Sequence, residues 1–239
     1  FVELTQNCGL ACPMCGRDDE ISYAGNRMSP QTFARVEDQL LATASFVDLR
    51  GWGESITLPE FPDRAARVTG HGARLRLITS MSFYSAAGFR ALAAQNAIVG
   101  VSLDTVDPAV LKVVRGGANF RKIVQNLQQL RAHYEDEGAD WQNVYFTVTV
   151  SPATAVDLGR LAGFAVDNGI TEMRLFPLQG RTAVGFDEPE FARKLEQQFA
   201  QIQVLQSRHP LDVRIGAELC PSMQVDRPRR KSHCIHPWQ

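Results

Sequence analysis

Residues 1–15, FVELTQNCGLACPMC, join a predicted strand to a loop that holds three cysteines. Residues 1–5 alternate apolar and polar side chains, which is the pattern of a half-buried strand. The chain then enters a loop in which Cys8, Cys12 and Cys15 have the spacing C-x3-C-x2-C. We therefore expect the fold to begin with a strand whose carboxyl end leads into a metal-binding loop.

Beyond this loop, the order of strand and then helix repeats along the chain. Further strands are predicted at 46–50, 74–79, 98–103, 144–150 and 172–176, and helices at 30–41, 62–69, 86–95, 120–134, 155–168 and 188–207. Such strand-then-helix units predict an α/β domain with a parallel sheet of six strands, either curled as a partial barrel or doubly wound. Residues 211–215 add one short apolar alternation.

Polar or conformationally permissive residues follow four of the predicted strands. They are the cysteine loop after the first strand, residues 51–54 after the second, residues 79–82 after the third and residues 102–104 after the fourth. Because ligands of parallel α/β folds bind at the carboxyl ends of the strands, we expect these four loops to form one site.

The composition excludes several classes of protein. The chain has 239 residues, 44% of them hydrophobic, and a formal net charge of −1, which gives no reason to expect nucleic acid or an anionic membrane as partner. The basic run at 227–231 is interpreted as a solvated linker. No apolar run approaches the length of about 18 residues that spans a membrane. Five cysteines, three of them clustered, indicate metal binding in a reducing, cytoplasmic setting more than a disulfide scaffold.

The number of cysteines in the loop bears on which metal they bind. A structural zinc site uses four ligands, and no fourth Cys or His follows closely enough to complete one. Three thiolates on a four-iron cluster leave one iron open for a reactant. A zinc-binding structural or interaction domain nevertheless remains the contrasting hypothesis.

The cysteine spacing in a loop after the first strand resembles the signature of the radical S-adenosylmethionine (radical SAM) superfamily. The segment Gly51-Trp52-Gly53-Glu54 is similar to the family's glycine-glycine-glutamate segment, where backbone groups and a carboxylate hold the methionine ammonium of the cofactor. By this resemblance, Gly51, Gly53 and Glu54 bind S-adenosylmethionine. Ser55 stands where the family commonly has proline.

Other positions resemble further contacts to the cofactor. Ser102 and Arg115 look like the family's serine and arginine that contact the methionine carboxylate, for which a planar guanidinium is a natural partner. Thr79 stands where members offer polar contacts to the ribose, and residues 175–177 resemble the last strand that brackets the adenine. Met14 replaces the usual aromatic residue, and we expect it to pack against the adenine as a flexible apolar group.

The resemblance implies a fold and an activity. The fold is a partial (β/α)6 TIM-like barrel of parallel strands with a C-terminal helix. The cofactors are a [4Fe–4S] cluster and S-adenosylmethionine, which is cleaved reductively to a 5′-deoxyadenosyl radical that abstracts a substrate hydrogen atom. The substrate is a peptide or a natural-product or sugar-like metabolite, and an electron donor such as flavodoxin or ferredoxin supplies the electron.

The C-terminal tail resembles the start of a second metal-binding segment. Cys234, shortly before Pro237-Trp238, is similar to the first cysteine of the auxiliary-cluster extension of SPASM and twitch-type members. We therefore expect a radical SAM core domain at 1–210, followed by a linker and the beginning of such an extension at 211–239. Both ends of the sequence look cut, so the remaining ligands of an auxiliary iron–sulfur cluster would lie beyond Gln239.

Overall fold

Six parallel strands form one open sheet in the computed structural model, which describes residues 1–17, 21–179, 188–216 and 219. The strands follow chain order across the sheet: β1 (Phe46–Asp48), β2 (Arg74–Thr79), β3 (Ile98–Ser102), β4 (Val144–Val150), β5 (Glu172–Pro177) and β6 (Asp212–Ile215). Every neighbouring pair is parallel, and β1 does not pair with β6 in the described part of the chain. The arrangement confirms the predicted α/β fold, a partial barrel that does not close.

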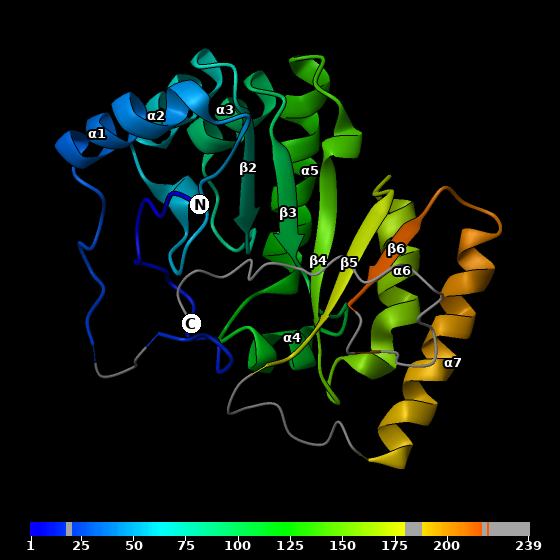
Figure 1. Ribbon diagram of the computed structural model, residues 1–239. Helices are drawn as coiled ribbons and strands as arrows, with labels where there is room; N and C mark the ends of the chain where they lie inside the picture. Colours follow the sequence, from blue (N-terminus) through cyan, green and yellow to red (C-terminus); the bar gives the residue numbers. More distant parts are fainter. Residues whose placement is uncertain (18–20, 180–187, 217–218, 220–239) are drawn as a thin grey trace.

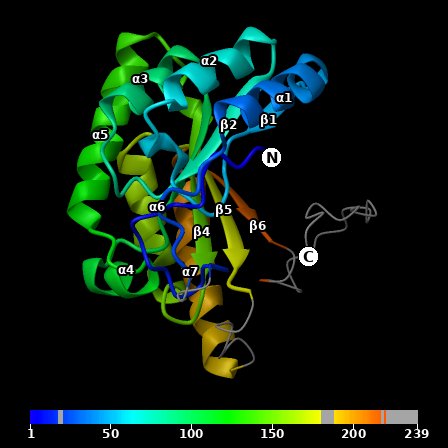
Figure 2. The ribbon, with the colours of Figure 1, turned by 90° about the vertical axis from the view of Figure 1, so that its left-hand side faces the viewer.

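The helices that connect the strands lie on one face of this sheet (Figures 1 and 2). They are α1 (Pro30–Leu40), α2 (Phe61–Gly70), α3 (Ala86–Ala94), α4 (Pro108–Val114), α5 (Phe120–Asp136), α6 (Leu158–Asp167) and α7 (Pro189–Gln206). Single 3-10 turns occur at Leu41–Thr43, Ser55–Thr57, Trp141–Asn143 and Ala155–Asp157. The helix predicted at 155–168 is therefore divided: residues 155–157 form the last of these 3-10 turns, and α6 begins at Leu158.

Helix starts follow local capping chemistry. Ser29 accepts a hydrogen bond from the Thr32 backbone N–H, and Pro30 occupies the first turn of α1, as expected from the sequence. The same chemistry forms α4, in which Asp107 caps the helix and Pro108 begins it. We did not predict this helix. The helix has only seven residues, so its apolar periodicity is too short to be recognised in the sequence.

The sheet has one face buried under helices and one face that is more open. In β2, Leu75, Leu77 and Thr79 are buried against the helices, whereas Arg76 and Ile78 between them are only partly buried. The period of two along a strand explains this alternation. We call the face that carries Arg76 and Ile78 the inner face, because it is the concave side of a partial barrel.

Residues 1–5 do not form the predicted first strand of the sheet. Val2 N–H donates to Asp48 O at 2.9 Å, so the segment passes the end of β1. No further ladder hydrogen bond joins residues 1–5 to β1 in the described part of the chain. Leu4 O instead accepts from Met28 N–H, and Thr5 makes an isolated antiparallel bridge with Arg27. The prediction was wrong because the backbone groups of this segment are shared between two neighbours instead of one ladder.

The sixth strand is β6, which the sequence indicated only as a short apolar alternation. Its residues pair in parallel with β5, from Glu172 opposite Asp212 to Leu175 opposite Ile215. The core sheet therefore extends past the boundary at residue 210, and the division into two domains stays a prediction. Among the described residues, no helix combines the length and apolarity needed to cross a bilayer.

Candidate functional site

The cysteine loop lies at the carboxyl end of the sheet. The arrows of β2 and β3 in Figure 1 point toward the end where α4 and the dark-blue loop lie. The loop is tied to the segment after α4, because Ala11 N–H donates to Gly116 O at 3.2 Å. Gly116 has a φ of 50°, and a Cβ on it would lie 2.1 Å from the Ala11 carbonyl carbon. Only glycine therefore allows this approach.

An arginine that we did not predict as a site residue holds the loop from within. The Arg17 guanidinium donates to Cys8 O at 3.3 Å and makes a shorter hydrogen bond to Leu10 O. The backbone carbonyls of a loop carry no residue-specific signal, so the sequence gives no hint of this contact. The three thiols, on Cys8, Cys12 and Cys15, are free and partly buried.

Burial raises the pKa of the Cys8 thiol, and it raises the pKa of the Cys12 thiol to about 11. Metal binding must therefore release protons from these thiols, since thiolates are the ligands. Within the described ranges, no three Cys, His, Asp or Glu side chains converge closely enough to hold one metal ion. Three thiolates fall one short of the four ligands of a structural zinc site, whereas on a four-iron cluster they leave one iron open.

Glu54 is a buried carboxylate beside this loop. It is 4% exposed, and its Oε2 accepts hydrogen bonds from the Ser80 N–H at 3.0 Å and the Ser80 hydroxyl at 2.7 Å. Its Oε1 is buried and has no partner among the described residues. Burial raises the pKa of Glu54, and the nearby Thr79 hydroxyl and the hydrogen bonds from Ser80 oppose that rise. A free, buried carboxylate oxygen is what an ammonium ligand requires.

Gly51 and Gly53 pack against the segment that precedes the cysteines. Gly53 N–H donates to Thr5 O at 3.1 Å, and a Cβ on Gly53 would lie 2.4 Å from the same oxygen. A Cβ on Gly51 would meet the Glu3 carboxylate at 2.3 Å. The missing side chain of Gly53 thus admits the neighbouring backbone.

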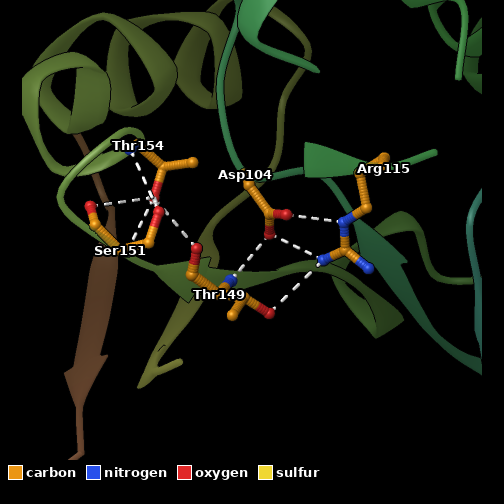
Figure 3. Close-up of polar contacts among 5 residues, drawn as sticks. All are labelled: Asp104, Arg115, Thr149, Ser151 and Thr154. Atoms are coloured by element: carbon orange, nitrogen blue, oxygen red, sulfur yellow. Dashed lines mark hydrogen bonds and ion pairs between the residues drawn. The ribbon is translucent and has the colours of Figure 1, made fainter. Parts of the chain in front are cut away.

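A buried ion pair lies beneath the end of α4 (Figure 3). Asp104, at 0% exposed, accepts from Arg115 Nε at 2.5 Å, from Arg115 Nη2 at 2.6 Å and from Thr149 N–H at 2.7 Å. Although burial lowers the pKa of Arg115, the Asp104 charge and hydrogen bonds raise it, so the guanidinium stays charged. Arg115 Nη1 has no hydrogen-bond partner within the described residues. The negative charges of the Cys12 and Cys15 thiolates also raise the pKa of Arg115.

The remaining predicted contacts differ in their accessibility. Ser102 ends β3 on the inner face, is partly buried and pairs in register with Thr147. Thr79 is 2% exposed, and its hydroxyl accepts from Met81 N–H, so its side chain shapes the turn after β2. Ser80 beside it makes the contacts to Glu54 described above. Cys234 lies outside the described residues.

A pocket of about 290 Å³ adjoins the cysteine loop. It is lined by Pro13, Met14, Val113, Val114, Thr149, Ser151, Pro152, Ala153, Thr154 and Leu178. Met14 brings the cysteine loop to its wall, and Ser151 and Thr154 form a hydrogen-bonded turn at the end of β4 (Figure 3). The pocket thus lies between the cysteines and the carboxyl ends of β4 and β5, with mostly apolar walls suited to a flat ring.

Comparisons with known proteins concern the family and the fold of the chain. A family model described as the Radical SAM superfamily matches residues 2–164. The structure of Streptococcus suis SuiB bound to S-adenosylmethionine is 14% identical, with a TM-score of 0.71 over 93% of this chain and 51% of that one. Native anSMEcpe with bound AdoMet is 13% identical, with a TM-score of 0.68 over 89% of this chain and 62% of that one. No curated protein sequence matches. The chain spans about half the length of SuiB, and at these identities the likeness concerns the fold.

Proposed function

Because the chain belongs to the radical SAM superfamily, we propose that it uses a [4Fe–4S] cluster and S-adenosylmethionine to modify a peptide by radical chemistry. The observation that carries the proposal is the set of groups that lie together at the carboxyl edge of the sheet. Three thiols, one buried carboxylate with a free oxygen and one fixed guanidinium meet there, although they come from distant parts of the sequence.

Cys8, Cys12 and Cys15 are the proposed cluster ligands, which leaves one iron without a protein ligand. When bound, the reduced cluster supplies one electron that cleaves S-adenosylmethionine to methionine and a 5′-deoxyadenosyl radical. The chain's own task is to hold the loop, through Arg17 at the Cys8 carbonyl and Gly116 at the Ala11 N–H. The zinc alternative would need a fourth ligand beside these three thiols.

The polar groups at this edge suit the methionine part of the cofactor. Glu54 Oε1 accepts from the ammonium group, because it is a buried acceptor that otherwise has no partner among the described residues. Arg115 Nη1 donates to the carboxylate, while Asp104 holds the other side of the same guanidinium. Ser102, with Gly51 and Gly53 shaping the neighbouring backbone, completes this part of the site. Thr79 and the partly buried Ser80 supply the hydroxyl groups after β2.

The pocket beside the cysteine loop suits the adenine part. Met14 and Leu178 both contribute apolar walls, one from just before the third cysteine and one from just after β5. A planar ring packs between such walls, and the flexible Met14 side chain can adapt to its shape. This placement supports the role that we predicted for Met14.

A peptide is the favoured substrate because of what similar structures contain. Streptococcus suis SuiB bound to precursor peptide SuiA is 14% identical to this chain, with a TM-score of 0.72 over 92% of this chain and 50% of that one. Another similar structure is native anSMEcpe with bound AdoMet and the Kp18Cys peptide. A sugar-like metabolite is the second candidate. An electron donor of the ferredoxin or flavodoxin type, a cytoplasmic location, and an auxiliary cluster with Cys234 as ligand remain predictions.

Anaerobic reconstitution tests the proposal directly. The protein loaded with iron and sulfide should be brown and should produce 5′-deoxyadenosine from S-adenosylmethionine when dithionite is added. Cys8→Ala should lose both the visible absorption and the cleavage product. A colourless protein that binds stoichiometric zinc under the same conditions would overturn the proposal in favour of a structural metal site.

A further inference from the structure

The inner face of the sheet carries a group of arginines below the cofactor edge. Arg50 follows β1, Arg76 lies in β2 and Arg174 lies in β5, and their side chains are 32%, 21% and 24% exposed. Arg76 precedes Thr79 at the end of β2 by three residues, which places it about 10 Å below that edge at about 3.3 Å per residue. The group thus lies where a substrate residue would enter the partial barrel from the cofactor side.

Two carboxylates hold these three arginines in place. Asp48 Oδ2 binds Arg76 Nε at 2.6 Å and Arg50 Nε at 3.2 Å, and Glu172 accepts a short hydrogen bond from Arg174 Nε. In Arg76 and Arg174 the hydrogen bond to the carboxylate comes from Nε, and Arg50 is ion-paired through Nε. The Nη nitrogens of these arginines have no hydrogen-bond partner among the described residues. Asp48 Oδ1 is likewise buried without a partner in this part of the chain.

An aromatic ring lies at the centre of the group. The Arg174 guanidinium lies 3.9 Å from the centroid of the Tyr145 ring, and a Cβ on Gly100 would come within 2.8 Å of the Tyr145 hydroxyl oxygen. The ring therefore lies across β3 at a position that only glycine leaves open. Burial raises the pKa of Tyr145, and the charges of Arg174, Arg76 and Arg50 oppose that rise.

Internal ion pairing alone does not account for this arrangement. Three cations share two anions here, so the group carries one excess positive charge; Glu172 also pairs with Arg214, whose charge Asp212 balances. Burial lowers the pKa of Arg50, and the charges of Arg76 and Arg174 act in the same direction. Partly buried guanidinium groups with free Nη donors bind carboxylates in a bidentate manner.

We propose that Arg50, Arg76 and Arg174 bind a carboxylate of the peptide substrate, from an acidic side chain or a C-terminus, and so fix the residue that is modified. This inference rests on the proposed function. The Arg174 guanidinium is stacked on Tyr145 and the Arg76 guanidinium is held by Asp48, so neither side chain has to be ordered when the peptide binds. The site selects substrates with a negative charge about 10 Å from the reacting edge.

Equilibrium dialysis of tritiated peptides tests this inference on the cluster-loaded protein with S-adenosylmethionine present. Four probes are compared: an alanine pentapeptide with a central glutamate and blocked ends, its glutamine counterpart, the glutamine peptide with a free C-terminus, and inorganic phosphate as competitor. We expect one or both peptides with a carboxylate to bind at least tenfold more tightly than the blocked glutamine peptide. The stronger of the two identifies the source of the carboxylate.

Variants locate the site. Arg174→Gln should remove the preference for the carboxylate. Arg90→Gln makes the same charge change at an exposed position of α3 outside the site and should keep the preference. Equal binding of all the peptides to the unmodified protein, displacement by phosphate as effective as by peptide, or an unchanged preference in Arg174→Gln would overturn the inference. Visible absorption and 5′-deoxyadenosine formation are recorded first. Their absence in the unmodified protein would refute the proposed function, and when both are present the peptide result tests the role of the arginines alone.

Discussion

Replacing Glu54 by glutamine should stabilise the protein and at the same time weaken its binding of S-adenosylmethionine. The Glu54 side chain is 4% exposed, and its Oε1 has no partner within the described residues. Leaving such an oxygen buried costs about 1–3 kcal/mol. Glutamine keeps an acceptor for Ser80 and removes the charge, although its amide nitrogen still lacks an acceptor. We therefore expect a gain of about 1–2 kcal/mol, or a rise in Tm of roughly 2–8 °C.

The loss of binding follows from the same oxygen. A hydrogen bond to a charged group contributes about 1.5–3 kcal/mol, so Glu54→Gln should weaken S-adenosylmethionine binding roughly 10- to 150-fold. Binding is measured by equilibrium dialysis, and stability by anaerobic thermal unfolding of the cluster-loaded protein without S-adenosylmethionine. The matched control is Glu196→Gln, an exposed position on α7, which should change neither quantity.

The gain in stability should also depend on pH. Burial raises the pKa of Glu54, so the folded state binds its proton more tightly than the unfolded chain does. The contribution of Glu54 to stability is therefore fully present below the ordinary glutamate pKa of about 4.3, and it is lost as the pH rises through the folded value. The advantage of glutamine should be absent near pH 4 and should grow toward neutral pH. A lower Tm for Glu54→Gln at neutral pH, or unchanged binding, would refute the reasoning.

Three further predictions concern the parts that hold the cofactor residues. Asp104→Asn breaks a buried pair and should cost about 3–5 kcal/mol in urea unfolding, with weaker S-adenosylmethionine binding that Asp104→Glu partly restores. Gly116→Ala, with φ at 50° and the Ala11 backbone in the way, should lower both stability and iron content, whereas Gly117→Ala, at φ 95° with open space, should lower stability alone; equal iron content in the two variants would contradict this. Arg17→Gln removes donors to two loop carbonyls and should speed loss of the cluster to a chelator, followed by its visible absorption; an unchanged rate would argue against this role of Arg17.

Local patterns were sufficient for most of the fold. The helix that begins at Pro30 and the strand at 74–79 are confirmed because capping and alternation act within a few residues. Residues 1–5 have an equally good alternation, yet their hydrogen bonds go to two different neighbours. Pairing partners depend on residues far away in the chain, so a pattern confined to five residues cannot reveal them.

The site shows the same limit at the level of side chains. The sequence indicated Glu54 and Arg115, and both lie at the predicted edge of the sheet. It did not indicate that Asp104 takes two of the Arg115 donors, because that contact needs the turn around α4 to bring the two residues together. Nor did it indicate that Thr5 O, from a segment far earlier in the chain, lies against Gly53.

The hydrogen bond from Ala11 to Gly116 makes two binding events depend on each other. Ala11 precedes a proposed cluster ligand, and Gly116 follows the arginine proposed to hold the methionine carboxylate. A cluster that fixes the loop therefore also fixes the position of Arg115. Without the cluster, S-adenosylmethionine has to order the loop on binding, and its affinity is lower. By thermodynamic reciprocity, S-adenosylmethionine must retard escape of the cluster to the extent that the cluster tightens S-adenosylmethionine binding. One glycine carbonyl thus couples the binding of the two cofactors.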